Sequence, residues 1–115
     1  MSPRSHSSVA ANRRTHALVF AALGDTTRLS LVVKLCRGKP RSISQLTERS
    51  KLTRQAITKH LRVLESAGIV HCVHTGRKSL FEVDLKPIVE VRDYLGFVSE
   101  QWDQALARLE SFVED

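Results

Sequence analysis

The sequence has little of what membrane proteins, zinc fingers and disulfide-rich proteins need. It holds only two cysteines, and Cys36 and Cys72 lie too far apart for the paired spacing of a zinc finger. No apolar run approaches the roughly 18 consecutive residues of a membrane-spanning helix. The stretch from Met1 to Asn12 lacks the apolar core of a signal peptide. We therefore expect a cytoplasmic protein with reduced cysteines and no membrane contact.

Signatures of catalysis are missing as well. With five glycines, the sequence has no phosphate-cradling glycine motif, and it shows no Ser/His/Asp or paired-carboxylate arrangement. We expect no enzyme activity and no cofactor.

What the sequence does have is positive charge, unevenly distributed. A chain of 115 residues fits one domain, and its formal net charge is +6. Residues 1–81 hold 15 Lys and Arg against three acidic residues, whereas residues 82–115 hold three against nine. The first part suits a polyanionic partner such as nucleic acid, and the acidic tail suits another task.

Helical periodicity predicts the secondary structure of most of the chain. We interpret residues 1–14 as a flexible basic arm and residues 15–115 as one domain. Four helices are expected before residue 68, over Thr15–Leu23, Thr26–Arg37, Ile43–Ser50 and Arg54–Ala67.

Capping residues mark where these helices begin and end. Asp25 and Thr53 are placed to cap the second and fourth helices, and Ser42 with Gln45 matches a capping box before the third. Gly68 stands where a helix commonly ends in the left-handed conformation. The expected inward residues of the second helix are Leu29, Val32, Val33 and Cys36, and those of the fourth are Ala56, Ile57, Leu61 and Leu64.

The pattern changes after Gly68. Ile69–Thr75 and Ser79–Asp84 are short runs compatible with β-strands, joined by a turn that contains Gly76. A hairpin directly after a helix-turn-helix is the wing of a winged helix. The predicted fold is mainly α (α+β), a winged helix-turn-helix with about five helices and a two-stranded hairpin wing.

The last segment carries a heptad pattern, which indicates a helix that packs against another helix. A helix of about 25 residues would be about 38 Å long, more than so small a body can cover. We therefore favour a homodimer over packing on the chain's own domain, with the apolar first helix included. The predicted interface residues are Leu18, Ile88, Val91, Leu95, Val98, Trp102 and Leu109, and the pattern also takes in Ala105 and Phe112.

Three stretches resemble the ArsR (ArsR/SmtB-like) family of regulators. Phe20–Leu29 is similar to the family's N-terminal signature, Leu52–Val70 to its recognition helix and Thr75–Phe81 to its wing. The resemblance runs from residue 16 onward in the right order. It implies a transcriptional regulator that binds double-stranded DNA, most often as a repressor on an inverted repeat.

Helix geometry then selects the DNA contacts. Side chains near the start of the recognition helix, opposite Ile57, Leu61 and Leu64, can reach base edges in the major groove. We expect base contacts from Arg54, Gln55, Thr58 and Lys59, phosphate contacts from Thr53 and Arg62, and contacts to backbone or minor groove from Arg77 and Lys78 at the wing tip. His60 can reach a phosphate or lie half-buried between helices.

The sequence departs from the metal-sensing members of that family. Their cysteine pair before the recognition helix has no counterpart in Ser42–Glu48, and residues 85–115 contain no histidine. Trp102–Glu110 resembles a metal-independent branch instead. Cys72 and His74 could share one strand face, but with Cys36 and His71 they form no complete ligand set, so we expect no metal.

Three alternatives stay open at this stage. A winged helix can serve as a protein-interaction module without DNA. The chain could sense a small organic ligand through Phe97 and Trp102, or thiol oxidation through Cys36 and Cys72. Against the last, Cys36 falls on the expected apolar face of its helix, where a buried free cysteine is an ordinary core residue.

Overall fold

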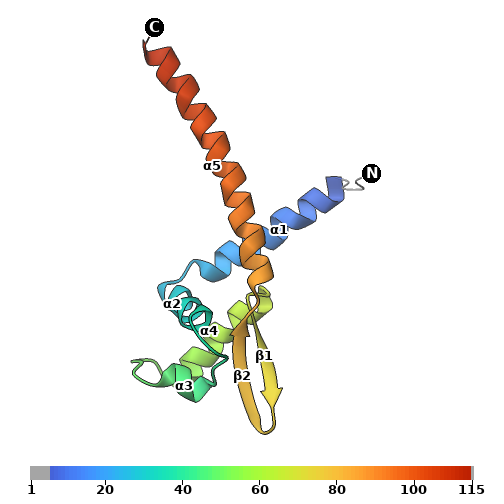
Figure 1. Ribbon diagram of the computed structural model, residues 1–115, viewed down its shortest axis with the longest axis vertical. Coiled ribbons are helices and arrows are strands. Elements are labelled where there is room, and N and C mark those ends of the chain that lie inside the picture. Colours follow the sequence, from blue (N-terminus) through green and yellow to red (C-terminus); the bar gives the residue numbers. More distant parts are fainter. Residues whose placement is uncertain (1–5, 115) are drawn as a thin grey trace.

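A computed structural model describes the backbone of residues 6–114 and the side chains of residues 13–113. In this part, five helices accompany one antiparallel hairpin. Helices α2, α3 and α4 form a body beside the hairpin, and α5 projects away from it (Figure 1). The predicted winged helix-turn-helix architecture is confirmed. The order is α1 (His6–Leu23), α2 (Thr26–Cys36), α3 (Ile43–Thr47), α4 (Arg54–Ser66), β1 (Val70–Thr75), β2 (Lys78–Val83) and α5 (Leu85–Glu114).

Short polar side chains start three of the helices, as predicted. The Asp25 carboxylate accepts a hydrogen bond from the backbone N–H of Arg28 at 3.0 Å. Ser42 and Gln45 form both bonds of a capping box at the start of α3. At the start of α4, the Thr53 hydroxyl accepts from the Ala56 N–H. These bonds satisfy N–H groups that a helix start leaves without partners, which fixes where each helix begins.

Helix α1 begins at His6, so its predicted start at Thr15 is wrong. No proline or glycine interrupts residues 6–23, and polar residues at the helix start hid its true length. Residues 1–5 of the predicted arm lie outside the described part of the chain. Whether residues 1–14 act as an arm separate from the domain stays a prediction.

The inward face of α2 also differs from the prediction. Leu31, Val32 and Leu35 are buried, whereas Leu29 and Val33 are nearly half exposed and Cys36 is exposed. Helix α2 carries two apolar stripes, and Val32 lies at the edge of both. The spacing alone could not choose between them. The expectation that Cys36 is a core residue is therefore wrong.

One hydrophobic core lies under the helix-turn-helix. The predicted inward residues Ile57, Leu61 and Leu64 of α4 are at most 1% exposed, and Leu46 of α3 is fully buried. This core holds α4 by one side and leaves its other side uncovered. The remaining core residues are Val19, Ala22, Leu31, Val32, Leu35, Ile69, Val70 and Val91.

The hairpin is tied to the body at two points. Its strands pair from Val70 with Val83 to Thr75 with Lys78, and Gly76 in the turn has a φ of +63°. Arg41, between α2 and α3, exchanges two backbone hydrogen bonds with Phe81 at 3.0 and 2.8 Å. At the other end, Gly68 has a φ of +77°, the left-handed conformation expected after α4. The wing is therefore fixed relative to both α3 and α4.

Helix α5 extends well past the body. Its 30 residues amount to about 45 Å of helix, and it meets α1 near its start. There the Tyr94 ring packs against His16 and Phe20, with ring centroids 5.0 and 6.2 Å apart. The radius of gyration is 18.7 Å, against about 13 Å for a compact chain of this length. One end of the molecule is therefore a free helix.

Candidate nucleic-acid interface

The uncovered side of α4 is polar and basic. Gln55, Lys59 and Arg62 are exposed, and Thr58 is half-buried with its hydroxyl donating to the Arg54 carbonyl oxygen at 2.7 Å. A shallow hollow of about 610 Å³ runs along the start of this helix. Gln55 and Lys59 line the hollow and can reach a groove of duplex DNA.

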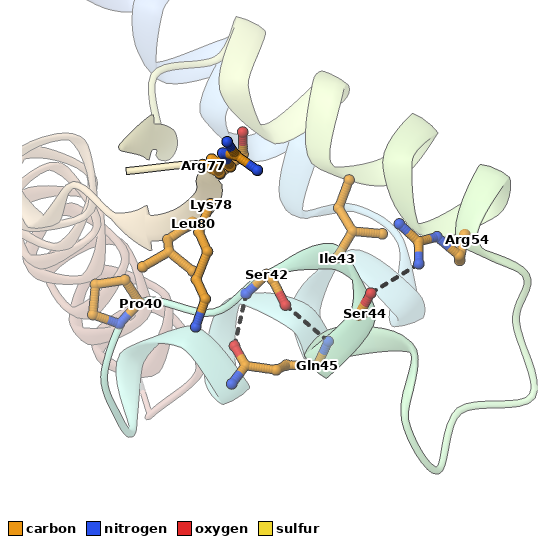
Figure 2. A pocket seen from close by; sticks show the side chains of 10 residues that line it. Pro40, Ser42, Ile43, Ser44, Gln45, Arg54, Arg77, Lys78 and Leu80 are labelled. Carbon is orange, nitrogen blue, oxygen red and sulfur yellow. Dashed lines mark hydrogen bonds between the residues drawn. The ribbon is translucent and has the colours of Figure 1, made fainter. Parts of the chain in front are cut away.

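Arg54 lines the same hollow and also contacts α3. Its Nη1 donates a hydrogen bond of 2.8 Å to the Ser44 hydroxyl of α3, as Figure 2 shows. This bond crosses from the second helix of the motif to the first. No sequence pattern indicates this contact, because ten positions separate the two residues and neither helix pattern requires it.

The wing tip adds two more cations on the side of α3. Arg77 and Lys78 are exposed, and together with Arg54 they line a cleft of about 620 Å³ between α3 and the hairpin (Figure 2). The structure thus brings the wing cations and the start of α4 to one surface. Eight residues were predicted to contact DNA, and this surface holds seven of them: Thr53, Arg54, Gln55, Thr58, Lys59, Arg77 and Lys78.

A junction of polar side chains holds the recognition helix to α1 and α2. The Arg28 guanidinium donates from Nε to the Ala22 carbonyl oxygen at the end of α1, and its Nη1 lies 3.4 Å from Nδ1 of His60 in α4. The same His60 nitrogen is 3.9 Å from the Asp25 carboxylate. His60 is therefore half-buried between helices, one of the two positions that the sequence left open.

Asp25 is the charged centre of this junction. The backbone N–H of Arg28 lowers the pKa of the Asp25 carboxyl below its usual value, and the charges of Arg28 and His60 act in the same direction. The sequence pattern indicates Asp25 as a helix cap but does not indicate the contacts of Arg28. A signal for Arg28 would have been its place in the first turn of α2, within reach of the last carbonyls of α1.

The predicted dimer residues fall into two groups. Val91 is buried in the core of its own chain and Ile88 packs against that core. Leu95, Trp102 and Leu109 are 49%, 64% and 59% exposed, so the heptad pattern continues where the body no longer covers it. Leu18 of α1 is likewise exposed, and Val98 is half-buried.

The residues considered for metal binding or redox chemistry are scattered. His71 Nε2 lies 2.7 Å from a Glu82 carboxylate oxygen, and His74 is bonded to Ser79 across the hairpin. Cys72 is half-buried. Within the part of the chain that the structure describes, no three His, Cys, Asp or Glu side chains gather as a metal site would require. None of its described helices is long and apolar enough to cross a bilayer.

The arrangement is that of a winged helix-turn-helix, and comparison with known proteins gives the family. The family described as "Bacterial regulatory protein, arsR family" matches residues 25–71. The HTH-type transcriptional regulator YuzN of Bacillus subtilis is 36% identical over 76 residues, which cover 61% of this chain and 83% of the relative. The chain belongs to the ArsR family of transcriptional regulators.

Solved structures agree with this assignment. An ArsR-like transcriptional regulator from Rhodococcus sp. RHA1 is 32% identical with a TM-score of 0.77, over 89% of this chain and 95% of that one. A winged helix-turn-helix domain from Mycobacterium bovis shares the fold at 21% identity, with a TM-score of 0.64 over 94% of this chain and 95% of that one. The resemblance found in the sequence is confirmed.

Proposed function

We propose that this regulator is a repressor that binds an inverted-repeat operator as a homodimer. The observation that carries the proposal is the shared surface of α4 and the wing. The apolar side of α4 is closed by the core, and its free side continues into the cations Arg77 and Lys78. Such a surface suits a polyanion with a groove wide enough for a helix. A module that binds only proteins would not need these cations.

Within this proposal the side chains divide by task. Gln55, Thr58 and Lys59 lie along the hollow beside α4 and would face base edges, where Gln can pair with adenine. Thr53 and Arg62 would contact phosphates, and the wing residues would contact backbone or minor groove. Bound in this way to neighbouring major grooves, the dimer would occlude RNA polymerase.

The homodimer is supported by the uncovered heptad face of α5. Leu95, Trp102 and Leu109 present an apolar stripe whose side chains stay 49%, 64% and 59% exposed in the described chain. The related domain from Mycobacterium bovis is described as homodimeric in solution. In a symmetric pair the same stripe on each chain would cover the other, together with Leu18 of α1.

The remaining parts of the proposal concern enzyme activity, cellular location and the N-terminal residues. The relatives are transcriptional regulators, which favours a protein that is not an enzyme. The family is described as bacterial, so the protein would work in the cytoplasm, where bacterial DNA lies. Residues 1–14 would form the basic arm beside the main domain.

Selection from a randomised duplex library tests the proposal. The wild type should enrich an inverted repeat with half-site centres about 10 base pairs, or a multiple, apart. Gln55→Ala should relax preference at one or two positions in each half-site, at a cost of about 1–3 kcal/mol per half-site. Lys86→Ala is the control, because this exposed lysine lies in the first turn of α5, which follows the end of the hairpin opposite its tip. An unchanged consensus for Gln55→Ala would show that α4 does not read the sequence.

A further inference from the structure

The cleft between α3 and the wing has a fixed shape and a single sign of charge. Its walls come from the start of α3 and the first residues of β2. The backbone bonds between Arg41 and Phe81 hold these walls together, and the capping box of Ser42 and Gln45 orders the α3 side. Figure 2 shows Lys78 extending from the hairpin into the space beside Gln45.

Charge around the cleft is entirely positive. Arg54, Arg77 and Lys78 are among the ten lining residues, and none of the ten is acidic. Among the described residues no carboxylate forms an ion pair with any of these three cations. Three like charges around one hollow repel one another, so an anion that enters the cleft would gain from all of them.

Arg54 is the residue whose place decides what the cleft can bind. Its hydrogen bond to Ser44 holds the guanidinium beside α3 at the wall of the cleft, and Arg54 also borders the hollow where Gln55 and Lys59 lie. A guanidinium has five N–H donors, and the bond to Ser44 uses one of them. The others can form the paired bonds that arginine makes with phosphate.

We propose that the cleft holds a stretch of one DNA strand's backbone, and that Arg54 binds phosphate and does not read a base. This inference deepens the proposed function and rests on it. The backbone would pass between the helix-turn-helix and the wing, with Arg54 on one side and Arg77 and Lys78 on the other. Sequence discrimination then falls to Gln55, Thr58 and Lys59. The outcome differs from the base contact that the position of Arg54 in the helix predicted.

Two measurements on four variants test the cleft. The variants are Arg54→Ala, Ser44→Ala, Lys78→Ala and the control Lys86→Ala, each checked for an unchanged circular dichroism spectrum and melting temperature. The first measurement is the salt dependence of affinity for the selected duplex. Arg54→Ala and Lys78→Ala should each reduce the log–log slope by about one unit per lost phosphate contact in each half-site. Ser44→Ala should weaken binding in the same direction but less, and Lys86→Ala should change nothing.

The second measurement locates the phosphate. Duplexes with a neutral methylphosphonate at one backbone position at a time should include one position where the wild type loses affinity and Arg54→Ala loses none. The consensus selected by Arg54→Ala should equal that of the wild type. A changed consensus with an unchanged salt slope would overturn the proposal and return Arg54 to base reading.

The experiments distinguish a wrong assignment of the cleft from a wrong proposed function. A wild type that selects no consensus and shows no salt-dependent duplex binding would overturn both. If the wild type selects a consensus that Gln55→Ala relaxes, while Arg54→Ala loses affinity equally on every methylphosphonate duplex, only the cleft is wrong.

Discussion

Helices α4 and α5 are built on similar patterns and are covered very differently. Both place apolar residues every three or four positions. On α4 these residues, Ile57, Leu61 and Leu64, are closed off by the core of the same chain. On α5 only the first turns are covered, with Val91 buried, and Trp102 is 64% exposed. The pattern shows which side of a helix needs a cover, but not which molecule supplies it.

Charge separates the two regions as well. Residues 1–81 carry a balance of +12 and residues 82–115 a balance of −6, counted from 15 cations against three acids and three against nine. The body with α4 is suited to DNA, and α5 is suited to face a second protein chain away from it.

The largest expected effect is the loss of the dimer through α5. Trp102→Asp should place two unpaired charges in a symmetric interface, one from each chain, and dissociate it. Sedimentation at micromolar concentration should give a dimer for the wild type and a folded monomer for the variant. Ala107→Asp adds the same charge on the opposite side of α5 and should stay dimeric. A monomeric wild type would show that no second chain covers the apolar side of α5, and would contradict this comparison with α4.

A smaller effect is expected in the core beneath α4. Leu61→Ala should lower the free energy of unfolding by about 2–5 kcal/mol, because it leaves a cavity where the leucine is 1% exposed. Val63→Ala on the same helix is the matched control, since Val63 is 41% exposed, and it should cost less than about 1 kcal/mol. Urea unfolding at one fixed protein concentration measures both. Equal losses of unfolding free energy in the two variants would mean that the side of α4 that carries Leu61 does not anchor the helix to the core.

The smallest effect concerns the junction that links α4 to α2. The pKa of Asp25 is lowered in the folded state by the Arg28 N–H, so its carboxylate stabilises the fold above its unfolded pKa, which is about 4. That stabilisation is lost as the pH falls through the lower folded value. Asp25→Asn keeps a capping oxygen but removes the charge. The wild type should be more stable than Asp25→Asn at pH 7, and the difference should shrink below about pH 4.

Urea unfolding of both proteins at pH 7, 5 and 3 checks this expectation. A difference in stability that stays constant over the three pH values would mean that the charge of Asp25 contributes nothing to the junction.

Local signals explain what could be predicted of the fold. The caps at Asp25, Ser42 and Thr53, and the left-handed Gly68, depend on a few neighbouring residues, and the structure confirms them all. The rotation of α2 could not be predicted, because both of its apolar stripes satisfy the same period and only packing selects one. The start of α1 was missed because polar residues at its beginning resemble a loop.

Contacts between residues far apart in the sequence explain which features of the candidate site could not be predicted. Seven predicted DNA contacts lie on one surface because the helix and the wing follow each other in the chain. The direction of Arg54 depends on Ser44 in a different helix, and the place of His60 depends on Arg28, 32 positions away. Periodicity describes single helices, so contacts between helices are outside its reach.

The bare apolar stripe on α5 has a consequence for how repression would respond to the amount of protein in the cell. Where single chains predominate, the quantity of paired chains rises as the square of the total, because two must meet to cover the stripe. Operator occupancy would then climb more steeply than expression of the regulator itself. A twofold fall in synthesis would then lower the quantity of dimer about fourfold, which gives a small protein a sharper threshold than a monomer could provide.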